Sequence, residues 1–175
     1  MALTIQKLTD HFGAEITGLD LTANLDDAVV SEIKAALDEH SVLVFRNQRF
    51  DDETQTAFSA RFGALETTVY KPEGDGGVPV ANITNVDFRT NELFPEGHSR
   101  LKSNSGNEMW HTDSSFKSTP AYCSMLSGRE VPPIGADTQF ASCRTAYDSL
   151  PEAERLQLDG LVAEHNYGHS RSLVK

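Results

Sequence analysis

Apolar and polar residues alternate at the start of the chain and then change to a helical period. Residues 3–21 alternate on both sides of Gly13, which predicts two short strands joined by a turn. Residues 26–41 place apolar side chains at helical spacing behind two aspartates, whose charges suit a helix N-terminus. The β-branched and aromatic run 41–48 is typical of a strand inside a sheet. The beginning of the chain is therefore expected to mix α and β structure.

The middle of the chain combines one more helix with two long loops. Residues 51–65 predict a helix that ends at Gly63. From residue 70 to residue 105 the sequence is rich in Gly, Pro, Asn and Ser, and it predicts loops on either side of a strand at 80–86. Loops of this length are uncommon unless they are disordered or cover a functional site.

Strands and two further helices are predicted in the last third of the chain. Residues 121–132 and 138–143 predict strands separated by a turn rich in Pro and Gly. Residues 142–161 predict two helical pieces that separate at Pro151, because proline has no amide hydrogen for a helix interior.

The composition is that of a globular protein with an acidic balance. The 175 residues suffice for a single domain over 1–175, and 38% hydrophobic and 23% charged residues are close to the globular average. The formal net charge of -11 argues against nucleic acid and anionic membrane surfaces as partners, since both attract clustered lysine and arginine. If the partner is a small anion, a few local cations must bind it.

Cysteine spacing and the N-terminus bear on cellular location. Cys123 and Cys143 have neither CxxC spacing nor a disulfide-framework pattern, which favours reduced thiols. The N-terminal segment lacks a basic start followed by an apolar run, and no stretch approaches the length of a membrane-spanning helix. We therefore expect a cytoplasmic protein without a membrane anchor.

The strongest chemical signal is the sequence NEMWHTDSSF at 107–116. His111 and Asp113 are two residues apart, and on a strand such residues point to the same face. An imidazole nitrogen and a carboxylate oxygen would then take adjacent positions around one metal ion. Two histidines and one carboxylate are typical of non-haem ferrous iron, so the pair is half of that signature. The alternative is a surface histidine beside a capping aspartate, because so short a pattern also occurs by chance.

Blocks along nearly the whole chain resemble one enzyme family. They are HFGAEITGLDL, HSVLVFRNQ, FSARFGALE, NEMWHTDSSF, SMLSGREVPPIGADTQF, RTAYDSLP and GLVAEHNYGHSR. The chain is similar to the taurine dioxygenase and chlorophenoxyacetate dioxygenase family of non-haem iron, 2-oxoglutarate-dependent oxygenases. It is slightly closer to the chlorophenoxyacetate branch. The W-H-x-D and G-x-D-T-x-F blocks are the most specific parts of the resemblance.

The resemblance implies a fold and a set of site residues. The fold is α+β, a double-stranded β-helix or jelly roll with flanking helices and the metal at the open end of the barrel. His111 and Asp113 would be two of the three Fe(II) ligands. The Thr138 hydroxyl would bind a carboxylate of 2-oxoglutarate, and the Asn107 amide would lie near co-substrate and substrate. The simpler alternatives are an ordinary strand residue at 138 and a loop cap at 107.

The resemblance also implies a reaction. The family uses Fe(II), 2-oxoglutarate and O2 to hydroxylate a small organic anion, an aryloxyalkanoate or a sulfonate, with release of succinate and CO2. Lys71 and Arg171 are candidate cations for such a substrate, with ordinary solvated charges as the alternative. His98 is a further candidate for substrate contact, although a merely exposed histidine is the simpler interpretation. The chain would then serve aromatic or sulfonate catabolism.

The family pattern continues beyond the last residue of this chain. In the family, about a hundred further C-terminal residues contain the histidine that is the third iron ligand. An arginine about eleven positions after that histidine binds the far carboxylate of 2-oxoglutarate. His165 and His169 are weak substitutes, because their block matches a family segment without ligands. We expect a jelly roll that is incomplete at the C-terminus, with uncovered apolar faces that favour a homo-oligomer. Where the family usually has a second glycine before D-T, Ala136 permits the turn if its φ is negative.

These departures leave alternatives open. Three explanations compete. We favour the first, in which the chain is a fragment or the ordered part of a longer protein. In the other two, a partner chain supplies the missing half, or the chain is a truncated inactive relative. The first functional hypothesis is therefore the oxygenase. The second is a non-catalytic metal-binding or anion-binding relative that lacks the third ligand. A zinc hydrolase is disfavoured because the sequence has no H-E-x-x-H motif.

Overall fold

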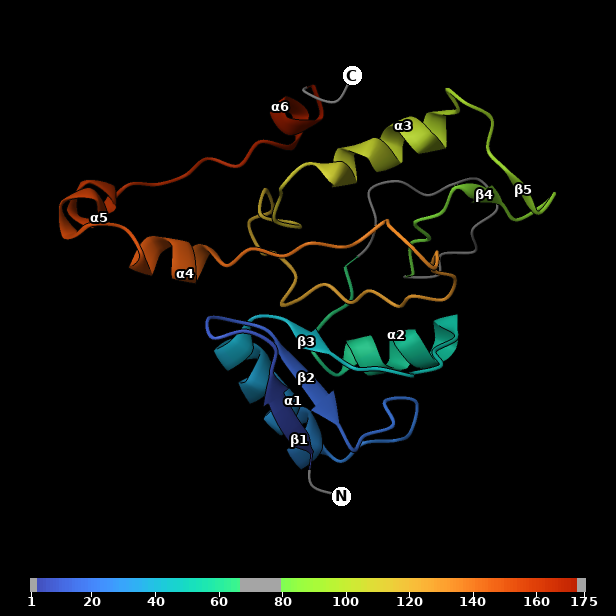
Figure 1. Ribbon diagram of the computed structural model, residues 1–175, viewed down its shortest axis with the longest axis horizontal. Coiled ribbons are helices and arrows are strands. Elements are labelled where there is room, and N and C mark those ends of the chain that lie inside the picture. The colour runs from blue at the N-terminus through green and yellow to red at the C-terminus, as the bar shows by residue number, and fades with distance from the viewer. Residues whose placement is uncertain (1–2, 67–79, 173–175) are drawn as a thin grey trace. The chain divides into compact units, whose positions relative to one another are not determined.

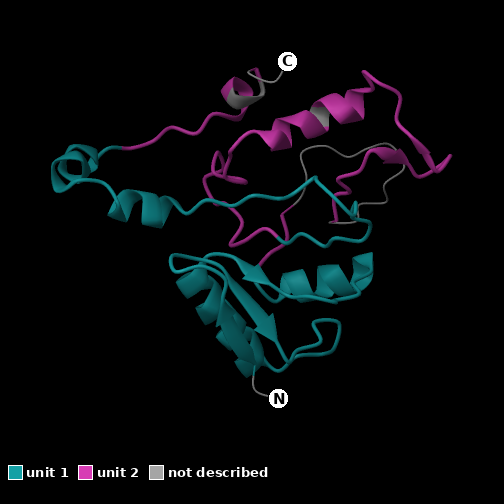
Figure 2. Cartoon of the chain, in the orientation of Figure 1, with its two compact units in different colours: residues 1–62, 125–161 teal, residues 63–124, 162–175 magenta. Residues whose placement is uncertain are grey.

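The computed structural model describes residues 3–66 and 80–172. The chain divides into two compact units (Figure 2). Unit 1 consists of residues 1–62 and 125–161, and unit 2 consists of residues 63–124 and 162–175. Each unit is therefore built from two separate stretches of sequence.

A three-stranded sheet lies in the N-terminal stretch of unit 1 (Figure 1). Strands β1 (Thr4–Lys7) and β2 (Ala14–Thr17) are antiparallel, and β2 pairs in parallel with the short β3 (Leu43–Val44). Gly13 directly precedes the return strand with a φ of +84°, a conformation that glycine adopts without steric cost. The two predicted strands around Gly13 are thus confirmed, and only two residues of the predicted strand 41–48 form a ladder.

Two helices complete the core of unit 1. Helix α1 (Asp27–His40) buries one face that includes Ile33, and α2 (Asp52–Ala60) contributes Phe58 to the same hydrophobic cluster. Ile33 is only 1% exposed, and burying a side chain of this size stabilises the fold by about 1.5–3 kcal/mol. The helices predicted from 26 and from 51 are therefore confirmed.

Helix α2 is shorter than predicted at its C-terminal end. Its start is fixed by a reciprocal capping box between Asp51 and Thr54. The predicted end at Gly63 is wrong, because the helix ends at Ala60 and Arg61 is its C-cap. The Arg61 guanidinium donates to the Leu25 carbonyl at 2.9 Å, which holds this residue at the helix end. Gly63 lies beyond the helix with a φ of +147°.

The second stretch of unit 1 is extended and then helical. The strands predicted at 121–132 and 138–143 are wrong, since these residues form no sheet ladder in the described part of the chain. Their composition favours extended backbone, but a strand also needs a hydrogen-bonding partner. Helices α4 (Cys143–Asp148) and α5 (Glu152–Leu158) separate at Pro151 as predicted.

Unit 2 contains short elements joined by irregular segments. Strands β4 (Val86–Asp87) and β5 (Glu92–Leu93) form a hairpin. They are followed by helix α3 (Ser99–Ser105), the 3-10 helix η1 (Gly106–Glu108) and, near the C-terminus, helix α6 (Tyr167–Ser172).

Two sequence predictions are corrected in unit 2. Of the strand predicted at 80–86, only the last residue lies in a strand. The loop predicted up to residue 105 contains both β5 and α3. Helix α3 forms in this polar sequence because the His98 side chain caps its N-terminus and accepts from the Arg100 amide at 3.2 Å.

The larger architecture follows from these sheets. The strands of the described residues form one three-stranded and one two-stranded sheet, and these do not close into a barrel. In the same part of the chain, every helix is too short or too polar to cross a membrane.

Candidate metal site

His111 and Asp113 lie in an irregular segment of unit 2 that follows η1. They were predicted on a strand, but neither residue belongs to a ladder, and Asp113 begins a turn. Their side chains nevertheless converge, with His111 Nε2 at 3.2 Å from Asp113 Oδ1. Both side chains are about half exposed, at 46% and 58%, so a ligand can reach them.

The His111 ring is oriented by a backbone carbonyl. Its Nδ1 lies 2.6 Å from the Met109 carbonyl oxygen, and because a carbonyl only accepts, Nδ1 carries the hydrogen. In the neutral ring, Nε2 then presents its lone pair, while in the imidazolium it carries a second hydrogen that points to Asp113. A second hydrogen bond of this kind fixes the tautomer of metal-binding histidines.

The Asp113 carboxylate is oriented in a similar way. The Ser124 hydroxyl donates to Asp113 Oδ2 at 2.6 Å, which leaves Oδ1 directed at His111. Sequence analysis missed Ser124, because this contact joins an irregular turn to an extended segment eleven residues later. No periodic pattern or short motif predicts such a pair.

The two facing atoms fit a divalent metal ion. A neutral Nε2 and a carboxylate oxygen both present lone pairs, so their approach requires a proton or a cation. Two donors about 2.1 Å from one ion and at right angles to each other are about 3 Å apart. The observed separation of 3.2 Å is close to this value. Among the described residues no group of three or more His, Cys, Asp or Glu side chains gathers as a metal site, and His111 and Asp113 form a facing pair.

A tight turn follows Asp113. Ser114 has a left-handed backbone with a φ of +56°, and the Lys117 amide donates to the Ser114 carbonyl at 2.9 Å. The Glu66 carboxylate accepts from the Ser114 hydroxyl and pairs with the Lys117 ammonium. The hydrogen bond from Lys117 and, second, that from Ser114 lower the pKa of Glu66 below its ordinary value. Glu66 was also missed by sequence analysis.

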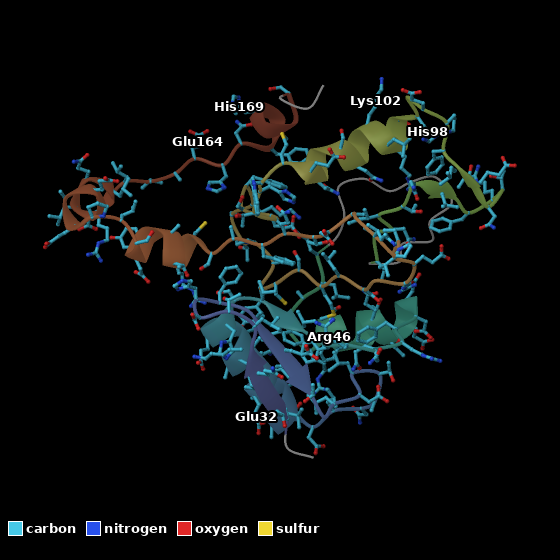
Figure 3. All side chains as sticks on the ribbon, in the orientation of Figure 1. Glu32, Arg46, His98, Lys102, Glu164 and His169 are labelled. Atoms are coloured by element: carbon cyan, nitrogen blue, oxygen red, sulfur yellow. The ribbon has the colours of Figure 1, made fainter. Side chains whose placement is uncertain are left out.

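The C-terminal segment of unit 2 contacts the same turn. His165 Nδ1 lies 2.7 Å from the Ser115 hydroxyl oxygen, and the ring of Tyr167 packs on Phe116 with centroids 4.8 Å apart. His169 lies on α6 (Figure 3). Neither His165 nor His169 forms part of a three-ligand cluster in the described residues, so their weak case as substitute ligands gains no support.

Comparison with known proteins identifies the family. The sequence model of the family described as "Taurine catabolism dioxygenase TauD, TfdA family" matches residues 4–174. The chain belongs to this family. The resemblance inferred from the W-H-x-D and G-x-D-T-x-F blocks is thus confirmed, including its lean toward the chlorophenoxyacetate branch.

Curated members of the family are somewhat more than a third identical to this chain over the aligned residues. The 2,4-dichlorophenoxyacetate dioxygenase of Cupriavidus pinatubonensis, named as alpha-ketoglutarate-dependent, is 38% identical over 99% of this chain and 62% of its own length. The (S)-phenoxypropionate/alpha-ketoglutarate dioxygenase of Sphingobium herbicidovorans is 35% identical over 98% of this chain and 56% of its own length. The chain therefore spans about three fifths of the length of these relatives.

Solved structures of the family have a similar fold. AAD-2, crystallised in complex with Mn(II) and N-oxalylglycine, has a TM-score of 0.85 at 35% identity, over 98% of this chain and 58% of its own. A taurine dioxygenase from Burkholderia xenovorans has a TM-score of 0.67 at 32% identity, over 90% of this chain and 51% of its own.

The two predicted co-substrate residues lie in different units. Asn107 is exposed on η1 in unit 2, close in sequence to the His111 segment. Thr138 is exposed in the extended part of unit 1. The condition set for the turn, a negative φ at Ala136, is not met, because the value is +55°. Gly135 before it also has a positive φ, so Ala136 adopts a conformation that suits the glycine usual in the family.

The predicted substrate residues are placed unevenly. His98 is half-buried at the start of α3, where its ring stacks on Phe94 with centroids 4.3 Å apart (Figure 3). This capping role was not foreseen. Arg171 lies on α6, one helical turn after Tyr167. Lys71 lies outside the described residues.

Proposed function

We propose that this chain belongs to a dioxygenase dependent on Fe(II) and 2-oxoglutarate that hydroxylates a small organic anion and releases succinate and CO2. The observation that carries the proposal is the His111–Asp113 pair, whose facing atoms are 3.2 Å apart and whose other atoms are hydrogen-bonded in the orientation that metal ligands require. The double-stranded β-helix and a single oxygenase domain over 1–175 are parts of this proposal. The supporting comparison is the fold of AAD-2, whose crystals contain Mn(II) and N-oxalylglycine.

The residues of this chain have separate tasks in the proposal. When bound, Fe(II) with 2-oxoglutarate and O2 supplies the oxidising power for hydroxylation. His111 and Asp113 hold the metal, and their hydrogen bonds to Met109 and Ser124 keep both donor atoms directed at it. The Thr138 hydroxyl donates to a carboxylate of 2-oxoglutarate. The Asn107 amide orients co-substrate or substrate beside the metal, which raises the effective concentration of the reacting groups.

The substrate class is an anion such as an aryloxyalkanoate, a sulfonate or a sulfate ester. Relatives are named for 2,4-dichlorophenoxyacetate, phenoxypropionate and sulfate esters. With a net charge of -11, the protein needs local cations to bind an anion, and we assign this task to Lys71 and Arg171. Arg171 is supported by its place on α6, whose Tyr167 packs on Phe116, three residues after Asp113. His98 remains a proposed substrate contact.

The same proposal covers the surroundings of the protein. We infer a cytoplasmic location, because the cysteine pattern suits reduced thiols. Nucleic acid and membranes are not proposed as partners, since the acidic balance disfavours both.

The first test is succinate formation from 2-oxoglutarate under air with Fe(II) and ascorbate, measured with a panel of aryloxyacetates, sulfonates and sulfate esters. We expect substrate-dependent succinate that falls at least a hundredfold in Asp113→Ala, because the metal loses a ligand. Asp148→Ala removes an exposed carboxylate from α4 and should leave the rate unchanged. Measurable succinate formation at the same rate in Asp113→Ala and wild type would refute the metal role of this residue.

The second hypothesis is a metal-binding relative without catalysis. The specific observation in its favour is that the described residues supply a pair of ligands rather than three. It predicts that the 175-residue chain binds Mn(II) at His111 and Asp113 but forms no succinate with any substrate of the panel. Turnover by the chain alone would reject it.

A further inference from the structure

Glu66 connects to both ends of the turn that follows Asp113. Its carboxylate accepts from the Ser114 hydroxyl and pairs with the Lys117 ammonium, three residues further on. The same two residues close the turn through their backbones, with the Lys117 amide 2.9 Å from the Ser114 carbonyl oxygen. One carboxylate from a distant part of the sequence thus bridges the side chains of a turn that begins at a proposed metal ligand.

The turn needs such a bridge because its backbone is unfavourable. Ser114 has a φ of +56°, a conformation that residues with a Cβ rarely adopt unless other contacts enforce it. Relaxation of this residue to a negative φ would redirect the chain next to Asp113. The Asp113 carboxylate would then turn away from Ser124 and from His111 Nε2. Contacts that hold Ser114 therefore also hold the metal-facing oxygen.

We propose that Glu66 is a positioning residue for the metal ligand Asp113. By holding Ser114 and Lys117 together, it keeps Asp113 Oδ1 facing His111 Nε2 at 3.2 Å. The inference rests on the proposed function, in which this pair binds the metal. Glu66 itself does not touch the metal pair in the structure; it acts through the turn.

The chemistry of the contact explains why a carboxylate is required. A glutamate has two acceptor oxygens and can bind a hydroxyl and an ammonium at the same time. A glutamine retains one acceptor oxygen and can donate its amide hydrogens to the Ser114 hydroxyl oxygen, but it has no negative charge to pair with the Lys117 ammonium. Both side chains of the ion pair are about 30% exposed, so water only partly replaces a lost contact.

A matched ion pair exists in unit 1. Glu15 on β2 pairs with Arg46 at 2.9 Å, and the side chains of Glu15 and Arg46 are 20% and 63% exposed. Glu15→Gln therefore removes the same charge from a partly buried ion pair without altering the turn after Asp113. Ser124→Ala is the positive control, because it removes a direct hydrogen bond to that ligand.

The test is NMR of the 175-residue protein, first without metal and then titrated with Mn(II), which broadens signals of nearby nuclei. Without metal, Glu66→Gln should shift the amide signals of 113–117 and the ring signals of His111, whereas Glu15→Gln should not. In the titration, Glu66→Gln and Ser124→Ala should each need about tenfold more Mn(II) for half-maximal broadening of the His111 ring signals. Glu15→Gln should match wild type within twofold.

A double variant tests whether Glu66 acts through the turn. If it does, the Mn(II) concentration for half-maximal broadening in the double variant Glu66→Gln/Ser114→Ala should rise over wild type by a smaller factor than the product of the factors for the two single variants. Ser114→Ala alone removes one hydroxyl, and it decides the question if Glu66→Gln does not fold. Independent, multiplicative effects would overturn the proposed route.

The two readouts separate this inference from the proposed function. Unchanged signals at 113–117 and His111 in metal-free Glu66→Gln would overturn the positioning role, whatever the metal does. Shifted signals in a protein whose wild type shows no selective broadening at His111 would reject the proposed metal site and still uphold the role of Glu66 in orienting Asp113.

Discussion

At the scale of single residues, Ala136 has the clearest energetic consequence. Its φ of +55° destabilises the folded state by about 1–2 kcal/mol for a residue with a Cβ. A glycine at this position avoids that steric strain, but its greater conformational freedom in the unfolded chain lowers stability by about 0.5–1 kcal/mol. Ala136→Gly should therefore raise the free energy of unfolding by about 0.5–1 kcal/mol, measured by urea denaturation. Ala141→Gly, in the same extended stretch but without a positive φ, should lower it. Destabilisation by both variants would show that Ala136 is not strained.

The sequence predicted the proposed ligand pair but not the residues that orient its side chains. His111 and Asp113 were found because their i, i+2 spacing and the family motif both mark them. The convergence was correct, although the strand invoked to explain it is absent from this segment. Ser124 contacts Asp113 across 11 residues, and Glu66 contacts Ser114 in the following turn across 48 residues. Such contacts depend on the tertiary path of the chain, which local periodicity does not encode.

At the scale of elements, the turn held by Glu66 should respond to acid. The pKa of this carboxyl is lowered in the folded protein, so its stabilising effect is fully present above the ordinary carboxyl range. The effect is lost as the pH falls through the lowered folded-state pKa. The difference in unfolding free energy between wild type and Glu66→Gln should therefore be constant from pH 6 to 8 and shrink below about pH 4. A difference that is the same at pH 3 and pH 7 would contradict this linkage.

Elements with their own local signal were predicted best. Helix α1 has apolar residues at a regular period, an acidic first turn and a buried face, so sequence and packing agree. The segments 121–132 and 138–143 have the composition of strands, yet they form no ladder in the described residues. Composition reports a preference for extended backbone, and pairing depends on which other chain segment lies alongside.

At the scale of the whole molecule, the exposed apolar residues of unit 1 require an explanation. Ile134 is 91% exposed and Val131 is 73% exposed, and both lie in an irregular segment that pairs with no strand among the described residues. Exposed apolar segments of this kind favour association with another surface, in line with the expected homo-oligomer. The similarity to AAD-2 over 98% of this chain and 58% of that one shows that larger relatives contain further structure beyond the matched region.

We expect the 175-residue chain to self-associate through this segment as its concentration rises. Sedimentation velocity across a hundredfold concentration range should show a shift from monomer to larger species. Ile134→Ser should weaken the association at least tenfold, because burial of an isoleucine side chain contributes about 1.5–3 kcal/mol and 1.4 kcal/mol corresponds to a factor of ten. Gln139→Ser changes an exposed polar residue of the same segment and should have little effect. A chain that stays monomeric throughout would show that these apolar side chains do not drive assembly by themselves.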